Sequence, residues 1–324
     1  MIPTQPQVAE FQAALRSARS VLISTHLNPD GDALGSALAV SHYLDQLEIP
    51  NEVICNNLAP YNLEFLPGVN RVRLETTREH DLAIVLDLDS LHRLGRTQDA
   101  IEACGRMILI DHHVPHEEPG HLRIVDTASP ATALILTRLL HACKARFTPE
   151  LATCLLAGIV TDTGSFRYRN TTPEALEAAA DLLQHGGDIV QVCEEVYQRK
   201  PLMSVKLLGK TLDHMVLDCN DRLAYSQLTA KDFAETGAGE PHTEGLVNEL
   251  LFINTVQIAF VIREPSPGKV RASIRSRGPY DVATAVRPFG GGGHRNAAGC
   301  TFEEPIEDAK RKLVEALKAC LASS

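Results

Sequence analysis

The sequence predicts an α/β protein in which an N-terminal, mostly parallel sheet with flanking helices is joined by a helical linker to a smaller α+β C-terminal domain. Three observations carry this prediction. From residue 20 onward, apolar strand-like runs alternate with stretches of helical periodicity. Two of these runs, residues 82–86 and 107–110, are continuously apolar, as is typical of strands buried on both faces of a parallel sheet. After residues 186–187 the pattern changes to short strands separated by turns.

The spacing of apolar residues and the positions of helix-ending residues predict the elements of the first domain. Leu34, Leu38, Leu44 and Leu47 recur at helical spacing, and Pro50 closes that helix. Strands are predicted at residues 21–24, 53–55, 82–86 and 107–110. Further helices are predicted at residues 131–143, 149–160 and 173–185.

The second half of the chain has a helical pattern over residues 189–209, interrupted at Pro201, and then strands. Those strands are predicted at residues 215–217, 223–227, 256–262 and 270–274. With 324 residues the chain is about twice the usual domain length. We therefore expect an α/β domain over residues 1–188, a helical linker over 189–212 and a smaller α+β domain over 213–324.

Composition excludes several classes of protein. With 44% hydrophobic and 22% charged residues the chain can bury real cores, so it is not disordered. It contains no apolar run near the ~20 residues that a bilayer span needs, and its first ten residues do not resemble a signal peptide, so a soluble cytoplasmic protein is expected. Its eight cysteines form no CxxC pair, which indicates reduced, packed thiols. The net charge of -10 argues against coating long nucleic acid.

The densest polar cluster lies between the first predicted strand and the first predicted helix. Within seven residues it holds three potential metal ligands, His26, Asp30 and Asp32, on a loop bent by Pro29 and Gly31. The carboxyl ends of parallel strands form the ligand crevice of an open sheet, so these side chains are expected at the functional edge. A single Asp is more often a cap or turn residue, and Asp32 could be an N-cap, but three such residues together favour a binding site.

The other apolar runs also end in carboxylates or imidazoles. The run 82–86 precedes Asp87 and Asp89, the run 107–110 precedes Asp111, His112 and His113, and the run 155–160 precedes Asp162. Carboxylates at the ends of buried segments are costly unless they are paired or bind a cation. Asp87 and Asp89 lie on the same side of their strand by period two, so periodicity leaves the choice between them open.

This ligand set predicts the chemistry of the site. Several carboxylates and imidazoles without thiolates suit Mn²⁺ or a similar borderline ion. Six or more ligands are too many for one ion that keeps an open position. Two ions about 3.5–4 Å apart would stabilise both the attacking and the leaving oxygens of an in-line phosphoryl displacement. The pattern therefore indicates a hydrolase for phosphate esters.

A second signal lies in residues 263–295, which carry seven Lys or Arg against two acidic residues. Four glycines at 290–293, followed by His294, allow backbone N–H groups to form an anion-binding nest. A flexible linker and a solvated charged face are the alternatives. Next to Arg275 and Arg277, phosphate binding is the better interpretation.

At these positions the sequence resembles the DHH phosphoesterases. The four motifs of that family are matched by residues 26–33 (HLNPDGDA), Asp87, residues 111–113 (DHH) and residues 161–164 (TDTG). The signature of the DHH-associated C-terminal domain is matched by residues 290–294 and 296–299 (NAAG). The resemblance covers nearly the whole chain, and it is strongest to the bacterial NrnA-like group of nano-RNA oligoribonucleases and 3'-phosphoadenosine 5'-phosphate phosphatases.

The resemblance implies two divalent ions, most readily Mn²⁺, and a role for each matched residue. One ion would be held by His26, Asp30 and Asp87, and the other by Asp32, Asp87, His112 and Asp162. His113 would donate to the substrate phosphate, and Asp111 would orient it. The distal phosphate or 5' end would be bound by Arg275, Ser276, Gly292, Gly293 and His294. The roles of Arg93, Arg167, Tyr168 and Arg295 are left open.

The expected activity is two-metal hydrolysis of short oligoribonucleotides and 3'-phosphoadenosine 5'-phosphate, with the substrate held between the two domains. A phosphodiesterase for cyclic di-AMP or its linear product would use the same residues. A nucleotide-binding regulator is the non-enzymatic alternative, and the complete ligand set argues against it. The expected partners are short RNA and small nucleotides, rather than long double-stranded nucleic acid or membranes. The oligomeric state, a homodimer included, is left open.

Overall fold

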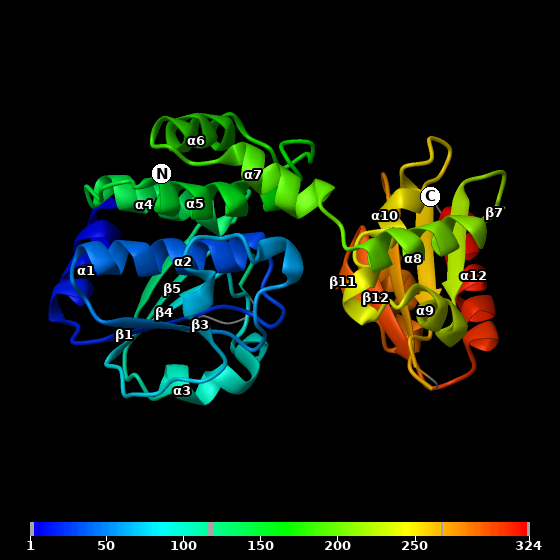
Figure 1. The fold of residues 1–324 in the computed structure, drawn as a ribbon, viewed down its shortest axis with the longest axis horizontal. Coiled ribbons are helices and arrows are strands. Elements are labelled where there is room, and N and C mark those ends of the chain that lie inside the picture. Colours follow the sequence, from blue (N-terminus) through cyan, green and yellow to red (C-terminus); the bar gives the residue numbers. More distant parts are fainter. Residues whose placement is uncertain (1–2, 116–118, 267, 323–324) are drawn as a thin grey trace. The chain divides into compact units, whose positions relative to one another are not determined.

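The computed structural model describes residues 3–115, 119–266 and 268–322. The chain divides into two compact units, Met1–Arg199 and Lys200–Ser324, each built on its own six-stranded sheet (Figure 1). The division falls within residues 189–212, where a helical linker is predicted, and the predicted domain limits stay a prediction. None of the described helices has the length and apolar character needed to cross a membrane.

The sheet of the first unit is entirely parallel, with the strand order β3-β2-β1-β4-β5-β6. Its strands are β1 (Val21–Ser24), β2 (Asn51–Ile54), β3 (Val72–Arg73), β4 (Leu82–Leu86), β5 (Met107–Asp111) and β6 (Leu122–Val125). β1, β4 and β5 are buried along their whole length, which explains their continuous apolar sequences. The strand order reverses between β1 and β4, so a crevice for ligands is expected at their carboxyl ends. This sheet confirms the predicted α/β class.

Helices cover both faces of this sheet. They are α1 (Gln5–Ser17), α2 (Gly31–Gln46), α3 (Gln98–Glu102), α4 (Thr132–Ala142), α5 (Pro149–Asp162), α6 (Pro173–Gln184) and α7 (Ile189–Cys193), the last followed by a π-helical turn (Glu194–Gln198). α2, α4 and α5 lie over one face with α6 outside them, and α3 lies on the opposite face (Figure 1). α5 and α6 each begin with a Thr cap followed by Pro, which sets where they start.

The helices α2 and α5 approach each other closely because glycines face the contact. A Cβ on Gly35 of α2 would lie 2.4 Å from the backbone oxygen of Cys154. A Cβ on Gly158 of α5 would lie 2.5 Å from both Ala133 Cβ and Asp32 Oδ1. These distances leave no room for a side chain. The close contact therefore sets how near α5 comes to the start of α2.

Gly158→Ala is expected to lower the free energy of unfolding by roughly 1–3 kcal/mol, because the added methyl group overpacks the contact and pushes against Asp32. Denaturant unfolding measures this change. Gly209→Ala is the matched control, since a Cβ on this residue of the second unit meets no described atom within 4 Å. The free energy of unfolding of that variant should equal the wild-type value or exceed it by up to about 1 kcal/mol. Equal destabilisation by both changes would contradict the close-contact explanation.

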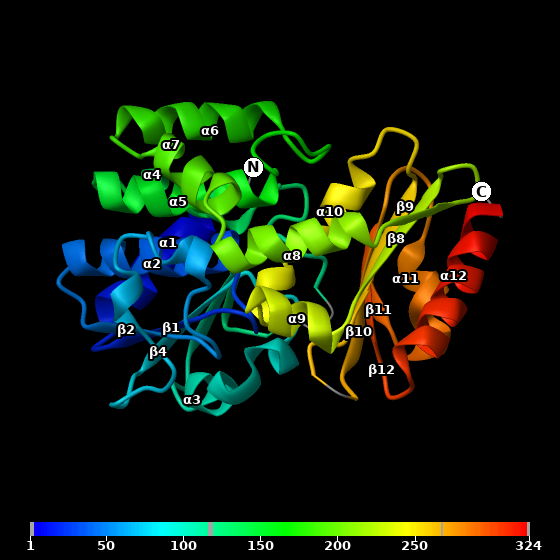
Figure 2. The ribbon, with the colours of Figure 1, turned by 45° about the vertical axis from the view of Figure 1, so that its right-hand side comes forward.

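The second unit has a mixed sheet in the order β11-β12-β10-β9-β8-β7, in which β8 and β9 are parallel and the other pairs antiparallel. Its strands are β7 (Val216–Asp218), β8 (Leu223–Leu228), β9 (Ile258–Arg263), β10 (Val270–Ser276), β11 (Gly292–His294) and β12 (Ala297–Phe302). Its helices are α8 (Leu202–Asp213), α9 (Ala230–Thr236), α10 (Leu246–Leu251), α11 (Val282–Val286) and α12 (Ile306–Ala322). α8, α9 and α10 pack on one face, and α11 and α12 on the other (Figure 2).

Candidate metal centre and substrate-binding strands

Acidic and imidazole side chains converge beyond the carboxyl ends of β1, β4 and β5. Three overlapping groups each place their ligand atoms within 4.8 Å of one another. The groups are His26 with Asp30 and Asp87, then Asp87 with His112 and His113, and then Asp32 with His112 and Asp162. They contain all six side chains predicted as metal ligands, together with His113. Asp162 arrives from the C-terminal end of α5 rather than from a strand.

Asp87 is the common member of two of these groups and is only 1% exposed. Its Oδ2 lies 3.4 Å from His26 Nε2, and its Oδ1 lies 3.4 Å from His112 Nε2. The Thr132 hydroxyl also donates to Oδ1, at 3.0 Å. Because its two oxygens face different imidazoles, one carboxylate connects two potential metal positions.

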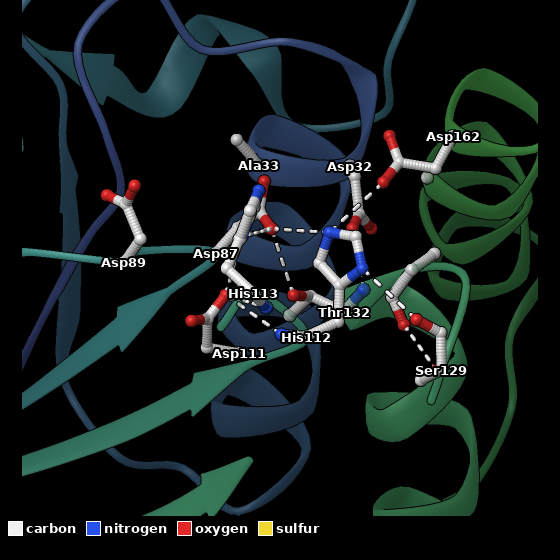
Figure 3. A network of polar contacts seen from close by, with 12 residues as sticks. Asp32, Ala33, Asp87, Asp89, Asp111, His112, His113, Ser129, Thr132 and Asp162 are labelled. Carbon is white, nitrogen blue, oxygen red and sulfur yellow. Dashed lines mark hydrogen bonds and ion pairs between the residues drawn. The ribbon is translucent and has the colours of Figure 1, made fainter. Parts of the chain in front are cut away.

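Asp89 lies apart from this cluster (Figure 3). It accepts hydrogen bonds from the Ser90 hydroxyl at 3.2 Å and from Arg93 Nη1 at 3.4 Å. β4 ends at Leu86, and Asp87 takes a left-handed φ of 57°. Period-two alternation no longer applies beyond that point, so the two aspartates take different directions. Arg93, whose role the sequence left open, is thus a hydrogen-bond partner of Asp89.

Backbone carbonyls orient two of the imidazoles. His26 Nδ1 lies 2.7 Å from the Leu27 carbonyl oxygen, and His112 Nδ1 lies 3.2 Å from the Ser129 carbonyl oxygen. A carbonyl oxygen accepts, so each Nδ1 carries the proton and donates it. Each Nε2 then faces the surrounding carboxylates and would offer its lone pair to an ion bound between them, which is the arrangement of a metal-binding histidine.

His113 has a different environment, although it follows His112 directly. Its Nδ1 donates to Asp111 Oδ1 at 2.8 Å, and the same oxygen accepts the backbone N–H groups of His112 and His113 at 2.8 and 3.1 Å. Burial alone would lower the pKa of His113, but the Asp111 hydrogen bond and the charge of Asp87 raise it to about 9. A protonated His113 keeps Nε2–H as a donor, which suits a group that contacts an anion.

Asp32 binds the N-terminal end of α4, a contact that the sequence did not predict. Its Oδ2 accepts the Thr132 N–H at 2.6 Å, and its Oδ1 accepts the Ala133 N–H at 2.8 Å. The N-cap position of α4 is Ala131, which has no capping side chain. Asp32 therefore caps this helix from another element, and the helix dipole stabilises its negative charge. The sequence did contain one indication of this contact. The helix predicted at residues 131–143 begins with Ala131, which has no side chain that could cap it, so a cap from elsewhere in the chain is needed.

The carboxylates of the cluster fit a divalent cation. Burial raises the pKa of Asp32 well above its ordinary value, and burial with the charge of Asp32 does the same for Asp162. By contrast, hydrogen bonding with His26 and the charges of His112 and His113 outweigh burial and hold the pKa of Asp87 at about 2. The contacts of Asp32 and Asp162 thus do not offset the cost of burying their charges, and the C-terminal end of α5 adds negative potential at Asp162.

The distances in the cluster point to the same conclusion. His112 Nε2 lies 3.3 Å from Asp162 Oδ2 and 3.4 Å from Asp87 Oδ1. Both separations exceed the 2.7–3.2 Å that is usual for an N–H···O hydrogen bond. Ligand atoms bound to one ion at about 2.0–2.2 Å lie roughly 3.0–3.5 Å from each other. The residues present therefore fit divalent metal ions.

In the second unit, strand register brings Arg275 and His294 onto one face. Arg275 of β10 pairs with Ala297 of β12, which in turn pairs with His294 of β11. The neighbouring row contains Ser273, Gly299 and Gly292. Paired residues project from the same face of a sheet. A basic side chain and an imidazole thus flank small residues on this face.

The glycines of the 290–293 run have different structural roles. Gly293 has a φ of 136°, and a Cβ there would lie 2.3 Å from the Ala297 carbonyl oxygen, so the fold itself requires glycine. A Cβ on Gly292 would meet no described atom within 4 Å. The fold gives no steric reason for glycine at 292, which is consistent with the close approach of a ligand.

Ser276 differs from the other residues predicted to contact substrate. Its side chain is buried, its hydroxyl donates to the Tyr280 carbonyl oxygen at 2.9 Å, and it accepts from Asn296 Nδ2 at 2.8 Å. It joins the turn after β10 to the segment before β12. Arg295 Nη2 donates to the Pro279 carbonyl oxygen at 2.7 Å, so that residue also braces this turn.

Family models match both units of the chain. Residues 20–159 match the N-terminal domain of the DHH family, and residues 220–323 match the DHHA1 domain. Both matches agree with the resemblance found in the sequence motifs.

Similar proteins align along nearly the whole chain. The bifunctional oligoribonuclease and PAP phosphatase NrnA of Thermus thermophilus is 31% identical over 312 residues, which is 96% of this chain and 92% of that protein. The protein of the same name from Bacillus subtilis is 28% identical over 93% of this chain and 95% of its own length. A crystal structure of an exopolyphosphatase-related protein from Bacteroides fragilis superposes with a TM-score of 0.91 at 28% identity, covering 98% of this chain and 96% of that one. The chain therefore belongs to the DHH family of phosphoesterases, with a DHH N-terminal domain followed by a DHHA1 domain.

Proposed function

We propose that this protein hydrolyses short oligoribonucleotides and 3'-phosphoadenosine 5'-phosphate with two divalent metal ions, of which Mn²⁺ supports the highest rate. The observation that carries the proposal is the Asp87 carboxylate, whose oxygens face His26 on one side and His112 on the other. Similarity to the NrnA proteins of Thermus thermophilus and Bacillus subtilis supports the choice of substrates.

The proposed ligands form two sets that share Asp87. One set is His26, Asp30 and Asp87, and the other is Asp32, Asp87, His112 and Asp162. When bound, the ions supply the positive charge that activates water and stabilises the oxygens of the reacting phosphate. The N–H groups of α4 orient Asp32 and offset part of the cost of burying its negative charge. The backbone carbonyls that hold Nδ1 of His26 and His112 leave each Nε2 directed toward the proposed ions.

His113 is the proposed donor to the phosphate. Asp111 holds its Nδ1, so its Nε2–H remains available to a non-bridging phosphate oxygen. Such a donor stabilises the charge that develops on phosphorus oxygens in the transition state. Asp111 acts through His113 as a positioning residue.

The proposed contacts of the second unit with substrate are Arg275, Gly292, Gly293 and His294, with Ser276 shaping the turn beneath them. Gly292→Ala is expected to raise KM roughly tenfold or more with little change in stability, because its methyl group would occupy space that the fold leaves open. Arg275→Ala should also raise KM. Both variants should bind Mn²⁺ as the wild type does, which calorimetric titration measures. Loss of metal in either variant would show that these strands support the metal centre instead.

Substrate length gives a direct test of the proposed function. The segment 263–295 has a net charge of +5 within a chain of -10, so few phosphates can be neutralised before the strand meets acidic surface. Two or three phosphate contacts imply a slope of log K against log salt of only about -1.4 to -2.1 for single strands. We expect kcat/KM to be highest for roughly two to five nucleotides and to fall with length.

The measurement is kcat/KM for a ladder of 5'-labelled oligoribonucleotides at two salt concentrations, beside 3'-phosphoadenosine 5'-phosphate and cyclic di-AMP. Rising efficiency toward long strands with a steep salt slope would indicate a processive exonuclease. Preference for cyclic di-AMP would assign the same residues to cyclic dinucleotide cleavage. Absence of hydrolysis with every substrate and metal would overturn the proposed function.

A further inference from the structure

We propose that Tyr168 is the stacking surface for a nucleobase of the substrate, next to the candidate metal centre. The inference rests on the proposed function and names the part of the substrate that this side chain binds. Tyr168 follows Asp162 by six residues and is 55% exposed. Large aromatic side chains are usually more buried than this. The exposure of Tyr168 near the candidate metal centre therefore suggests a role in binding.

The turn that carries Tyr168 has an unusual backbone. Gly164, Ser165 and Phe166 all have left-handed φ values, of 57°, 57° and 62°. Residues with a Cβ rarely adopt this conformation, and such positions cluster at ligand-binding and active sites. The turn brings the Tyr168 N–H to within 3.0 Å of the Thr163 carbonyl oxygen. The strain thus places the tyrosine beside the end of α5.

One face of the Tyr168 ring is held against the turn. A Cβ on Gly164 would lie 2.4–2.6 Å from three atoms of the ring, so the Cα of this glycine packs directly on it. Further along, Asn170 Nδ2 donates to the Asp162 carbonyl oxygen at 3.0 Å and ties the segment to the metal centre. Gly164 covers part of the ring, and 55% of the residue is exposed, so aromatic surface remains accessible for stacking.

An exposed aromatic side chain six residues after Asp162, on a turn bonded to the end of α5, fits a nucleobase. The base of a nucleotide is separated from its own phosphate by one ribose, so the proposal places the phosphate near Asp162 and its base on the ring of Tyr168. Stacking tolerates every base, because each has a π-face, and it supplies affinity that a short substrate cannot obtain from many phosphates. Arg167 is braced beside it, since its Nε donates to the Gly164 carbonyl oxygen at 2.7 Å.

The first experiment crosses variants with substrates that lack a base. Tyr168→Ala is expected to raise KM for a diribonucleotide about 5- to 150-fold, whereas Tyr168→Phe should stay within about twofold of wild type. The same variants are measured with two abasic analogues of the diribonucleotide, each of which lacks one base. On the analogue that lacks the stacked base, wild type and Tyr168→Ala should have the same KM. An equal loss on all three substrates would overturn the proposal and leave Tyr168 as a structural residue.

The second experiment measures stacking without turnover. The chain has no tryptophan, so Tyr168→Trp creates a single indole fluorophore. With Mg²⁺ present, AMP should quench its emission and ribose 5-phosphate should not. Phe252→Trp, at a 60% exposed residue of the second unit, is the control and should respond to neither ligand. Equal responses to AMP and ribose 5-phosphate at position 168 would overturn the proposal. If the wild type hydrolyses no substrate, the proposed function fails, and the AMP response still tests Tyr168 independently.

Discussion

Asp87→Asn is expected to reduce kcat by roughly a thousandfold or more while the protein still folds. The variant keeps the shape of the side chain and an oxygen that can accept from the Thr132 hydroxyl. It loses the negative charge, and one carboxylate oxygen becomes an amide N–H₂ group that repels cations. Because the two oxygens face His26 and His112, both proposed metal positions should weaken together.

The measurements are kcat with saturating Mn²⁺, Mn²⁺ stoichiometry by calorimetric titration, and thermal unfolding. Asp89→Asn is the matched control, since Asp89 is two residues away and pairs with Ser90 and Arg93 instead of the cluster. It should lose far less activity than Asp87→Asn. Wild-type protein treated with chelator should lose turnover and regain it best with Mn²⁺. Near wild-type turnover in Asp87→Asn, or the reverse order of the two variants, would show that the shared ligand is placed wrongly.

The neighbouring histidines 112 and 113 are expected to fail in different ways. His113→Gln should reduce kcat by roughly 10²–10³ through loss of a donor to the transition state, with both metals retained. His112→Gln should instead lose metal, because His112 Nε2 faces Asp87 and Asp162. Asp111→Asn should retain metal and lose roughly 10- to 100-fold in kcat, since it removes the acceptor that holds His113.

Metal titration separates these outcomes from a general loss of structure. The comparison is between two adjacent residues in the same loop, so a local disturbance would affect both alike. If His113→Gln released metal while His112→Gln retained it, the roles assigned to the two imidazoles would be exchanged. Unchanged kcat in His113→Gln would remove it from the mechanism.

The sequence predicted the parallel sheet and the edge at which the site lies. The continuous apolar runs at 82–86 and 107–110 became β4 and β5, buried on both faces. Polar residues that follow such strands can reach only the carboxyl edge, so His26, Asp87 and His112 were expected to meet there. Sequence periodicity was sufficient because burial on both faces leaves a distinct apolar pattern.

The sequence predicted less of the second unit. The glycines at 290–293 indicated a nest or a linker, whereas residues 292–294 form β11 at the edge of the sheet. A strand of glycines carries no apolar alternation, so periodicity could not reveal it. The row of Arg275, Ala297 and His294 likewise depends on pairing between segments about 20 residues apart in the chain.

Residue type and order along the chain determined the chemistry of this protein: a set of carboxylates and imidazoles suited to divalent cations, distributed over the ends of several buried segments. Only the tertiary structure decided which way each side chain points. Periodicity could not choose between Asp87 and Asp89, and the left-handed turn at Asp87 separates them. Nor could it show that Asp32 caps α4, because that contact joins residues 100 positions apart. Local sequence encodes strands and helices through short-range sterics and burial, whereas the direction of a carboxylate depends on hydrogen bonds that form only when distant elements pack.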